Sequence, residues 1–450
     1  MAERNRELTI YARRIVRSAG EHSGAVVVRG DRIEQVLDQA RATAHQPAGD
    51  VLEVPDDCVL MPGLVDTHVH VDEPGRTEWE GFASATAAAA AGGVTTIVDM
   101  PLNSIPPTVD VAALETKQAA ARDQAVVDVA FWGGAIPDNL DDLQALHEAG
   151  VVGFKCFLLP SGVDEFPPLD GQQLRAAMTR IASFGGLLIA HAEDGALIDP
   201  AVAEMGPAYR SFLDSRPEAA EVTAIDHLLR ATRETGCRTH IVHLSAATAL
   251  PEVAAAKAEG LPLTVETCPH YLTLEAERIP DGATEFKCCP PIRDAANRDQ
   301  LWQALLDGVI DFVVSDHSPC TVGLKRKDVG DFGLAWGGIA SVQLSLPVMW
   351  TEAARRGVSL SQLGAWMGAR PAEQVGLPGR GAIEPGNRAD LVVFAPDETF
   401  VVDPAQLLHR NPITAYAGMQ LRGVVRATLL GGEPVDAAQP RGRLLRRGAV

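Results

Sequence analysis

The sequence predicts an α/β protein, namely a (β/α)8 TIM barrel with a small β-sandwich domain built from both chain ends. Eight apolar segments rich in β-branched residues recur along the middle of the chain, and most precede a stretch with helical composition. Short alternating segments typical of strands lie before and after this region. The 450 residues are 46% hydrophobic and 22% charged, which suffices for the core of a barrel with insertions.

The expected barrel strands alternate with helices, as parallel βα units require. The strands are residues 63–70, 95–101, 127–134, 152–158, 187–193, 239–245, 263–270 and 311–317. The helices expected between them include residues 81–91, 111–121, 140–149, 218–235, 247–259 and 298–307.

The two ends of the chain have a different pattern. Short strands are expected at residues 8–16, 25–28 and 32–35, and again at residues 389–394 and 424–430. We therefore expect residues 1–60 and 385–450 to form the composite β-sandwich and residues 61–384 to form the barrel. The basic tail, residues 441–450, is expected to be mobile.

Charge and cysteine content exclude several classes of function. The formal net charge is −20, from 39 basic and 59 acidic residues, which argues against nucleic acid or an anionic membrane as a partner. Seven cysteines without a Cys-x-x-Cys pair indicate reduced thiols rather than a disulfide framework. The N-terminus is charged and lacks the apolar core of a signal peptide, so a cytoplasmic protein is expected.

The run Leu60-Met-Pro-Gly-Leu-Val-Asp-Thr-His-Val-His70 ends the first barrel strand with two histidines. Residues two apart in a strand point the same way, so Asp66, His68 and His70 share one face. Two imidazoles arranged in this way can hold a metal ion between them. A single His-x-His is more often incidental, so the residues farther along the chain decide between the two interpretations.

Further polar residues follow at the ends of other expected strands, where barrel enzymes carry their chemistry. With the first pair, the candidate metal-binding residues are His68, His70, Lys155, His191, His243 and Asp316. His240 is three residues from His243 and is expected to face away in a structural role. His270 and His317 are expected to have supporting or loop roles. Lys155 is a cation near neutral pH, so it suits a metal site only if it is neutralised or modified.

These motifs resemble the cyclic-amidohydrolase branch of the amidohydrolase superfamily, which contains allantoinases, dihydropyrimidinases (hydantoinases) and dihydroorotases. The segments Pro-Gly-Leu-Val-Asp-Thr-His-Val-His, Gly-Phe-Lys, His191, His243 and Ser-Asp-His-Ser occur in the family's order. The resemblance implies that carbon dioxide converts Lys155 to a carbamate, N6-carboxylysine, which bridges two divalent metal ions. One ion would bind His68, His70 and Asp316, and the other would bind His191 and His243.

The resemblance also implies a mechanism and a cofactor. A hydroxide between the two ions would attack the cyclic amide, and Asp316 would be the catalytic residue that shuttles the proton to the leaving nitrogen. Zinc is the first expectation for the metal, with manganese, cobalt and iron as alternatives, since imidazole and carboxylate ligands suit all of them. Family members are commonly tetramers, so a homotetramer is expected.

The choice among cyclic amides depends on a few positions. Dihydroorotases carry an arginine two residues after the second histidine, whereas this chain has Asp72, which we expect to repel an anionic substrate. Hydantoinases usually carry a tyrosine shortly after the modified lysine; none follows Lys155, although Ser161 could substitute for it. Residues 73–82, 100–108 and 335–340 resemble allantoinases more closely than hydantoinases.

This resemblance implies hydrolysis of the hydantoin ring of allantoin to allantoate, a step of purine breakdown. Contacts to the ureido arm of the substrate are expected from Asn103, Ser318, Cys289 and Gly337. Two alternatives stay open. One is a hydantoinase or dihydropyrimidinase of relaxed specificity, and the other is a non-catalytic scaffold of the same fold.

Overall fold

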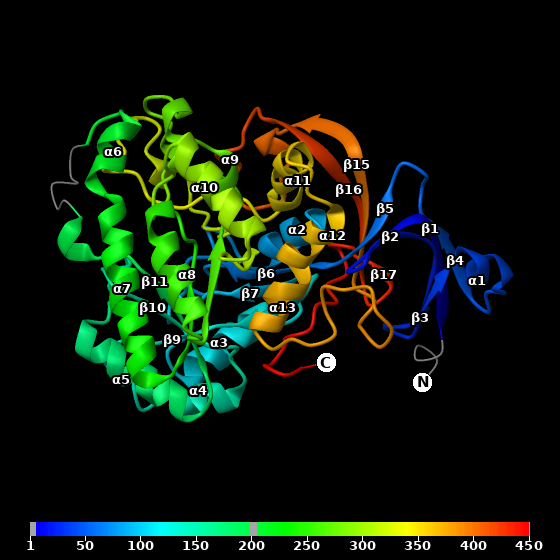
Figure 1. Cartoon of the computed structure of the whole chain (residues 1–450), viewed down its shortest axis with the longest axis horizontal. Coiled ribbons are helices and arrows are strands. Elements are labelled where there is room, and N and C mark those ends of the chain that lie inside the picture. The colour runs from blue at the N-terminus through cyan, green and yellow to red at the C-terminus, as the bar shows by residue number, and fades with distance from the viewer. Residues whose placement is uncertain (1–5, 199–204, 450) are drawn as a thin grey trace.

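The computed structural model describes residues 6–198 and 205–449. Residues 1–5 and 450, which belong to the expected terminal domain, lie outside the described residues. Figure 1 shows an α/β body beside a sheet in which the first and last parts of the chain lie together. The candidate site belongs to the α/β body.

Each of the eight expected barrel segments contains or overlaps an observed strand, and all of these strands pair in parallel. A three-stranded sheet consists of β6 (Leu64–Val69), β7 (Val94–Asp99) and β8 (Asp128–Phe131). A six-stranded sheet consists of β9 (Gly133–Gly134), β10 (Phe154–Phe157), β11 (Leu187–His191), β12 (Arg238–Ile241), β13 (Leu263–Thr267) and β14 (Phe312–Val313). The expected segment 127–134 is therefore divided into β8 and β9.

The two parallel sheets meet at both of their edges. Only Trp132 separates β8 from β9, and its backbone amide donates to the carbonyl of Asp99 in β7. At the opposite edges, Val69 of β6 forms a parallel bridge with His317, beyond the end of β14. The backbone amide of His70 donates to the carbonyl of His317 at 2.8 Å. The carboxyl ends of the first and last strands are thereby held side by side.

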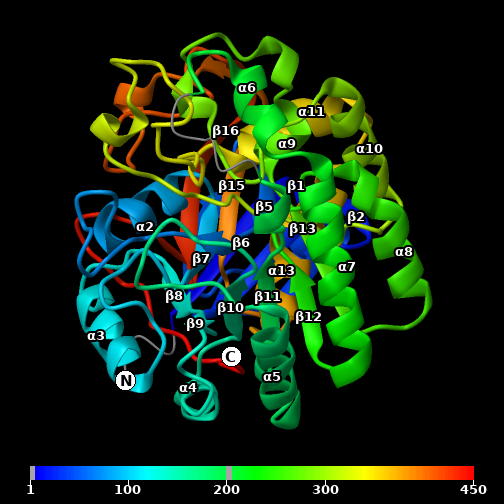
Figure 2. The ribbon, with the colours of Figure 1, turned by 90° about the vertical axis from the view of Figure 1, so that its left-hand side faces the viewer.

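Helices cover the outer side of these strands, as Figure 2 shows for α3, α4, α5, α7 and α8. The helices that follow the strands are α2 (Phe82–Ala91), α3 (Val111–Ala121), α4 (Leu143–Ala149), α5 (Gly171–Ser183), α7 (Glu218–Thr235), α8 (Leu250–Ala258) and α10 (Ala295–Leu306). Local sequence sets their ends. Asp170 and Gln173 form a capping box at the start of α5, and Gly236 ends α7 in a left-handed conformation.

Further helices complete the body. They are α6 (Tyr209–Ser215), α9 (Pro269–Thr273), α11 (Ser345–Arg355), α12 (Leu360–Gly364) and α13 (Arg370–Gln374). None of the helices within residues 6–198 and 205–449 is long and apolar enough to cross a membrane.

The chain ends combine into one continuous hydrogen-bonded sheet of eight strands, and the expected sandwich packing of this sheet stays a prediction. The strands are β1 (Glu7–Arg17), β2 (Gly20–Arg29), β3 (Arg32–Asp38), β4 (Asp50–Glu53), β5 (Val59–Pro62), β15 (Leu391–Val401), β16 (Gln420–Leu430) and β17 (Glu433–Pro434). A short helix, α1 (Gln39–Ala44), follows β3. The sheet is continuous because β5 pairs with β1 on one side and with β15 on the other.

Residues 441–449, the described part of the C-terminal tail, pack against the α/β body, so the expectation of a mobile tail was wrong for them. Leu444 forms a parallel bridge with Val129 of β8, and the amide of Leu445 donates to the carbonyl of Val129 at 2.8 Å. The side chain of Leu445 is buried in an apolar cluster that includes Trp132. The basic composition of the tail concealed these two leucines, which anchor it through the hydrophobic effect.

Candidate metal centre

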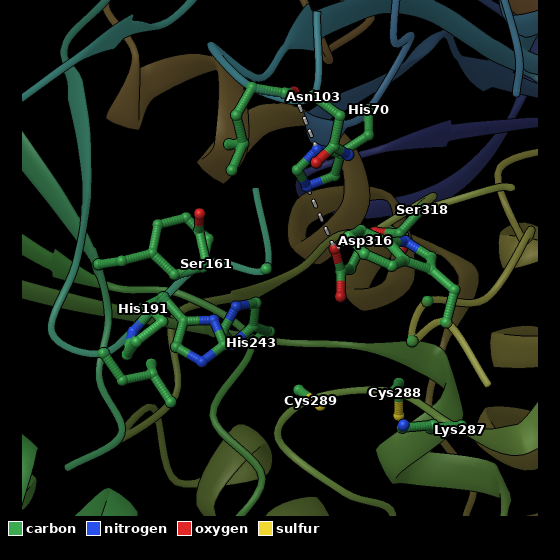
Figure 3. Close-up of a pocket in the computed structure, with 18 of the residues that line it drawn as sticks. His70, Asn103, Ser161, His191, His243, Lys287, Cys288, Cys289, Asp316 and Ser318 are labelled. Carbon is green, nitrogen blue, oxygen red and sulfur yellow. Dashed lines mark hydrogen bonds and ion pairs between the residues drawn. The ribbon is translucent and has the colours of Figure 1, made fainter. Parts of the chain in front are cut away.

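One cavity brings together all of the candidate residues from the sequence. It has a volume of about 270 Å³ and opens beside the carboxyl ends of the parallel strands, where β6, β10 and β11 contribute side chains. Its lining includes the six candidate metal-binding residues and the four candidate substrate contacts, namely His68, His70, Lys155, His191, His243, Asp316, Asn103, Ser318, Cys289 and Gly337. Figure 3 shows the imidazoles of His70, His191 and His243 directed into this cavity with the carboxylate of Asp316.

His68, His70 and Asp316 form the first part of the centre. All three are buried, and one ligand atom of each lies within 4.8 Å of the others. Nε2 of His68 is 3.2 Å from Oδ1 of Asp316, and Nε2 of His70 is 3.9 Å from the same oxygen. Two imidazole nitrogens and a carboxylate oxygen at this separation could hold one divalent ion.

His191 and His243 form the second part, and their ring centroids are 4.6 Å apart. The ring of His243 also lies 5.3 Å from that of His68, so the two parts adjoin. Burial lowers the pKa of both His191 and His243, and the ammonium of Lys155 contributes to both shifts. These histidines are therefore neutral near pH 7, as a metal ligand must be.

Lys155 lies on β10 with only 1% of its surface exposed. Burial lowers the pKa of its amine from 10.5 to about 8, although Asp316 and Glu266 oppose the shift. A lower pKa raises the fraction of neutral amine, which is the form that reacts with carbon dioxide. The environment of Lys155 is thus compatible with the carbamate that the resemblance implies.

Unpartnered polar atoms in this cluster test whether a metal would fit. Nε2 of His68 and Nδ1 of His243 are buried and have no hydrogen-bond partner among the described residues. An unsatisfied buried polar atom costs about 1–3 kcal/mol, and a bond to a metal ion would remove that cost. By contrast, His240 donates or accepts at both nitrogens, with Thr264 at 2.8 Å and Glu266 at 3.0 Å, which agrees with a structural role.

Two buried glutamates that the sequence analysis did not identify hold the histidines in place. Nδ1 of His68 lies 2.5 Å from Oε1 of Glu266 on β13, and Nε2 of His191 lies 2.7 Å from Oε2 of Glu193. A carboxylate on one ring nitrogen fixes the ring and directs the other nitrogen toward a metal. The available signal was an acidic residue inside an apolar strand, since Glu266 interrupts the run Leu263–Thr267.

The backbone at two candidate residues explains why the strands end earlier than expected. His243 and Asp316 have φ angles of +38° and +44°, in the left-handed region that residues other than glycine rarely adopt. A strand cannot continue through this conformation, so β12 ends at Ile241 and β14 at Val313. Strained backbone of this kind is commonly retained at functional sites.

The two weaker histidine candidates have different surroundings. His317 has a structural role, because its Nε2 forms a hydrogen bond with Glu80 at 3.2 Å and its Nδ1 accepts a hydrogen bond from the backbone amide of Ser341. His270 lies in the first turn of α9 and close to Asp316 and Cys268, with ligand atoms within 4.8 Å of one another. Both of its ring nitrogens are buried without a hydrogen-bond partner in the described chain.

Asp72 is fully buried and is not among the residues that line the cavity. Burial raises the pKa of its carboxyl well above the usual value. The expected repulsion of an anionic substrate by Asp72 stays a prediction. Its Oδ1 accepts a hydrogen bond from Nδ2 of Asn103 at 3.1 Å. Asp72 therefore orients a cavity-lining amide.

The remaining candidate contacts differ in whether their polar groups already form hydrogen bonds within the protein. Oγ of Ser318 donates to Oδ1 of Asp316 at 2.8 Å, so Ser318 orients the carboxylate as well as lining the cavity. Oγ of Ser161 donates to the carbonyl of Phe166 at 2.7 Å. This hydroxyl therefore stabilises its own loop and does not take the place of the tyrosine that hydantoinases usually carry. Cys289 and Gly337 lie next to each other, since a Cβ added to Gly337 would be 3.7 Å from Sγ of Cys289.

Comparison with known proteins agrees with this geometry. The model of the amidohydrolase family matches residues 59–435. An allantoinase from Streptomyces avermitilis is 58% identical over 445 residues, covering 98% of this chain and 99% of that protein. An allantoinase from Arabidopsis thaliana is 44% identical over 449 residues, covering 95% of this chain and 87% of that protein.

Among solved structures, the L-hydantoinase (dihydropyrimidinase) from Arthrobacter aurescens is similar, with a TM-score of 0.88, 28% sequence identity and 98% of each chain covered. A family match across most of the chain, and relatives this similar over nearly their whole length, show that the chain belongs to the amidohydrolase family, alongside the allantoinases.

Proposed function

We propose that this chain is a binuclear metal hydrolase that opens the hydantoin ring of allantoin to give allantoate. The observation that carries the proposal is the convergence of four histidines, Lys155 and Asp316 on one cavity in a chain 58% identical to an allantoinase. A hydrolase acting on a cyclic amide needs a positive centre for the developing oxyanion and a group that moves a proton, and this cavity offers both.

Two metal ions would be held by the chain's own residues. His68, His70 and Asp316 would bind one ion, His191 and His243 would bind the other, and a carbamate on Lys155 would be shared between them. We propose zinc, with manganese, cobalt and iron as alternatives that suit the same donors. When bound, the ions would lower the pKa of a water molecule and polarise the amide carbonyl.

Asp316 is the candidate for proton transfer. Burial on its own would raise its pKa, but the neighbouring His68, His70 and His270 outweigh burial and lower the pKa below its usual value. The carboxylate is therefore ionised near neutral pH and can accept a proton, and Ser318 fixes its Oδ1 by a hydrogen bond. We assign to it the delivery of that proton to the leaving nitrogen.

We further propose that the two parallel sheets are arcs of one closed (β/α)8 barrel. The adjacency of β8 and β9 and the bridge between Val69 and His317 support closure. The barrel would span residues 61–384, and residues 1–60 and 385–450 would form the second domain. A cytoplasmic homotetramer is our proposal for location and assembly, and light scattering of the purified protein tests the assembly.

The substrate panel tests the proposed activity. With two ions per chain, kcat/KM should be higher for allantoin than for hydantoin or dihydrouracil. A preference for either of the other rings would instead favour a hydantoinase or dihydropyrimidinase, which the structural similarity to an L-hydantoinase keeps as the second candidate. A protein that binds less than one metal ion and hydrolyses none of the three would be a non-catalytic scaffold.

A further inference from the structure

Arg216 connects the wall of the cavity to the second half of the metal centre. It directly follows α6 and lines the cavity, with 14% of its side chain exposed. Its Nε and Nη2 donate to the two carboxylate oxygens of Glu193 at 3.0 and 2.7 Å, which is the forked geometry of a strong arginine–carboxylate pair. The same Glu193 accepts a hydrogen bond from Nε2 of His191.

The other edge of this guanidinium is not used by the protein. Nη1 of Arg216 makes no hydrogen bond to any residue within 6–198 or 205–449. It is also absent from the fully buried atoms that lack a partner, unlike Nε of Arg293. A guanidinium keeps its charge and presents planar donors, so a free edge at a cavity wall is suited to a carbonyl oxygen.

The other cavity-lining cations are less suited to this role. Nζ of Lys287 donates to the carbonyls of Ala335 at 2.6 Å and Gly333 at 3.4 Å, which leaves a single N–H and no planar edge. Lys155 belongs to the proposed metal centre. Among the cations that line the cavity in the described residues, Arg216 thus offers a planar donor edge.

We propose that Arg216 is a specificity-determining residue that donates from Nη1 to the carbonyl of the ureido arm of the substrate. Its other edge would at the same time hold Glu193 and, through it, His191. This inference rests on the proposed function, because the ureido arm is what distinguishes allantoin from hydantoin. Arg216 would then bind the arm of the substrate and, through Glu193, also orient the proposed metal ligand His191.

The test compares a ligand with the arm and a ligand without it in the metal-loaded, full-length protein. For the wild type and Arg216→Lys, kcat and KM are measured with allantoin, and the inhibition constant is measured with hydantoin. Lysine keeps the positive charge beside Glu193 but loses the second donor edge. We expect kcat/KM for allantoin to fall about 10- to 100-fold, while the hydantoin constant changes less than about twofold, as for loss of one polar contact.

The pair formed by Arg380 and Asp390 is the control. It is a buried arginine–aspartate pair at 2.9 Å, and neither residue lines the cavity. Arg380→Lys should leave the allantoin-to-hydantoin ratio unchanged. An equal change for both ligands in Arg216→Lys, or no change for either, would overturn the role of Arg216. Metal content, measured on each variant, shows whether His191 has kept its ion.

A comparison of two ligands on the wild-type protein does not depend on the folding of a variant. 5-Propylhydantoin has an arm of similar length without a carbonyl, so it should bind at least about tenfold more weakly than allantoin. Equal binding of the two would exclude recognition of the arm's carbonyl. Wild-type protein that is fully loaded with metal and inactive on allantoin would overturn the proposed function itself, whereas an active wild type with an unchanged ratio in Arg216→Lys overturns only this inference.

Discussion

The carboxylate of Glu266 holds the imidazole of His68, with Oε1 of Glu266 only 2.5 Å from Nδ1 of His68. The two residues are 198 positions apart in the sequence and are both buried. Because Nδ1 is occupied, Nε2 of His68 is directed toward Asp316. The orientation of a proposed metal ligand therefore depends on β13, a strand that is distant from it in the sequence.

Glu266→Gln should weaken metal binding. The amide cannot hold the imidazole as an ionised carboxylate does, and loss of such an orienting partner typically costs about 10- to 100-fold in metal affinity. Competition with a chelator of known affinity measures the effect. Glu221→Gln is the control, since Glu221 is an equally buried carboxylate outside the cavity. Equal metal affinity in Glu266→Gln and the wild type would contradict the orienting role.

Lys155→Ala should lose activity by more than about a hundredfold, since the metal centre supplies several kcal/mol of transition-state stabilisation. Propionate or another short carboxylic acid should restore part of the activity by replacing the carbamate. Lys327→Ala, at a half-exposed lysine paired with Glu285, should behave as the wild type. If Lys155→Ala still bound two ions and remained insensitive to carboxylic acids, the shared carbamate would be wrong.

His409 should make the protein less stable as the pH falls. Burial lowers its pKa from 6.5 to about 4; the nearby His317 adds to this shift, and the carboxylate of Glu80 opposes it. Between pH 6.5 and about pH 4, His409 is protonated in the unfolded chain but not in the folded chain. Protonation therefore favours the unfolded chain in this range, so the free energy of unfolding is highest above pH 6.5 and falls as the pH falls toward 4.

His409→Gln should therefore flatten the decline in unfolding free energy by up to roughly 3 kcal/mol between pH 6.5 and 4. Denaturant unfolding of metal-free protein at several pH values measures the difference from the wild type. The same slope in both proteins would mean that His409 is not responsible.

Leu445→Ala should destabilise the fold by about 2–5 kcal/mol, as expected for a buried leucine. Leu445 is 6% exposed, whereas Leu408 is 48% exposed and provides the control. Leu408→Ala should change stability by less than about 0.5 kcal/mol. Equal thermal midpoints for the wild type and Leu445→Ala would show that the tail does not contribute to the core.

The positions of the parallel strands could be predicted because buried strands are apolar runs with local signals. Their ends could not, because His243 and Asp316 take left-handed backbone conformations that no residue preference indicates. The joining of the terminal strands into one sheet depends on β5 pairing with strands from both chain ends, which is a long-range property. The packing of the tail could not be predicted, because Leu444 and Leu445 lie between arginines in a segment of basic composition.

The candidate residues of the centre could be identified because each histidine lies in or just after a recognisable strand. The hydrogen bond from Asn103 to Asp72 could not be predicted, because the two residues are 31 positions apart in the sequence. The roles of Glu193, Glu266 and Arg216 depend on their hydrogen-bond partners, which are either distant in the sequence or brought toward the cavity by the fold. A single sequence does not reveal these contacts.

The central claim is that two metal ions in this cavity support hydrolysis of allantoin. Its most direct test is a titration of metal-depleted protein with zinc in bicarbonate buffer, in which bound zinc and the initial rate of allantoin hydrolysis are measured together. The account predicts that the rate rises and levels off at two bound ions per chain. Full activity without metal or with one ion, or no allantoin hydrolysis with two ions bound, would contradict it.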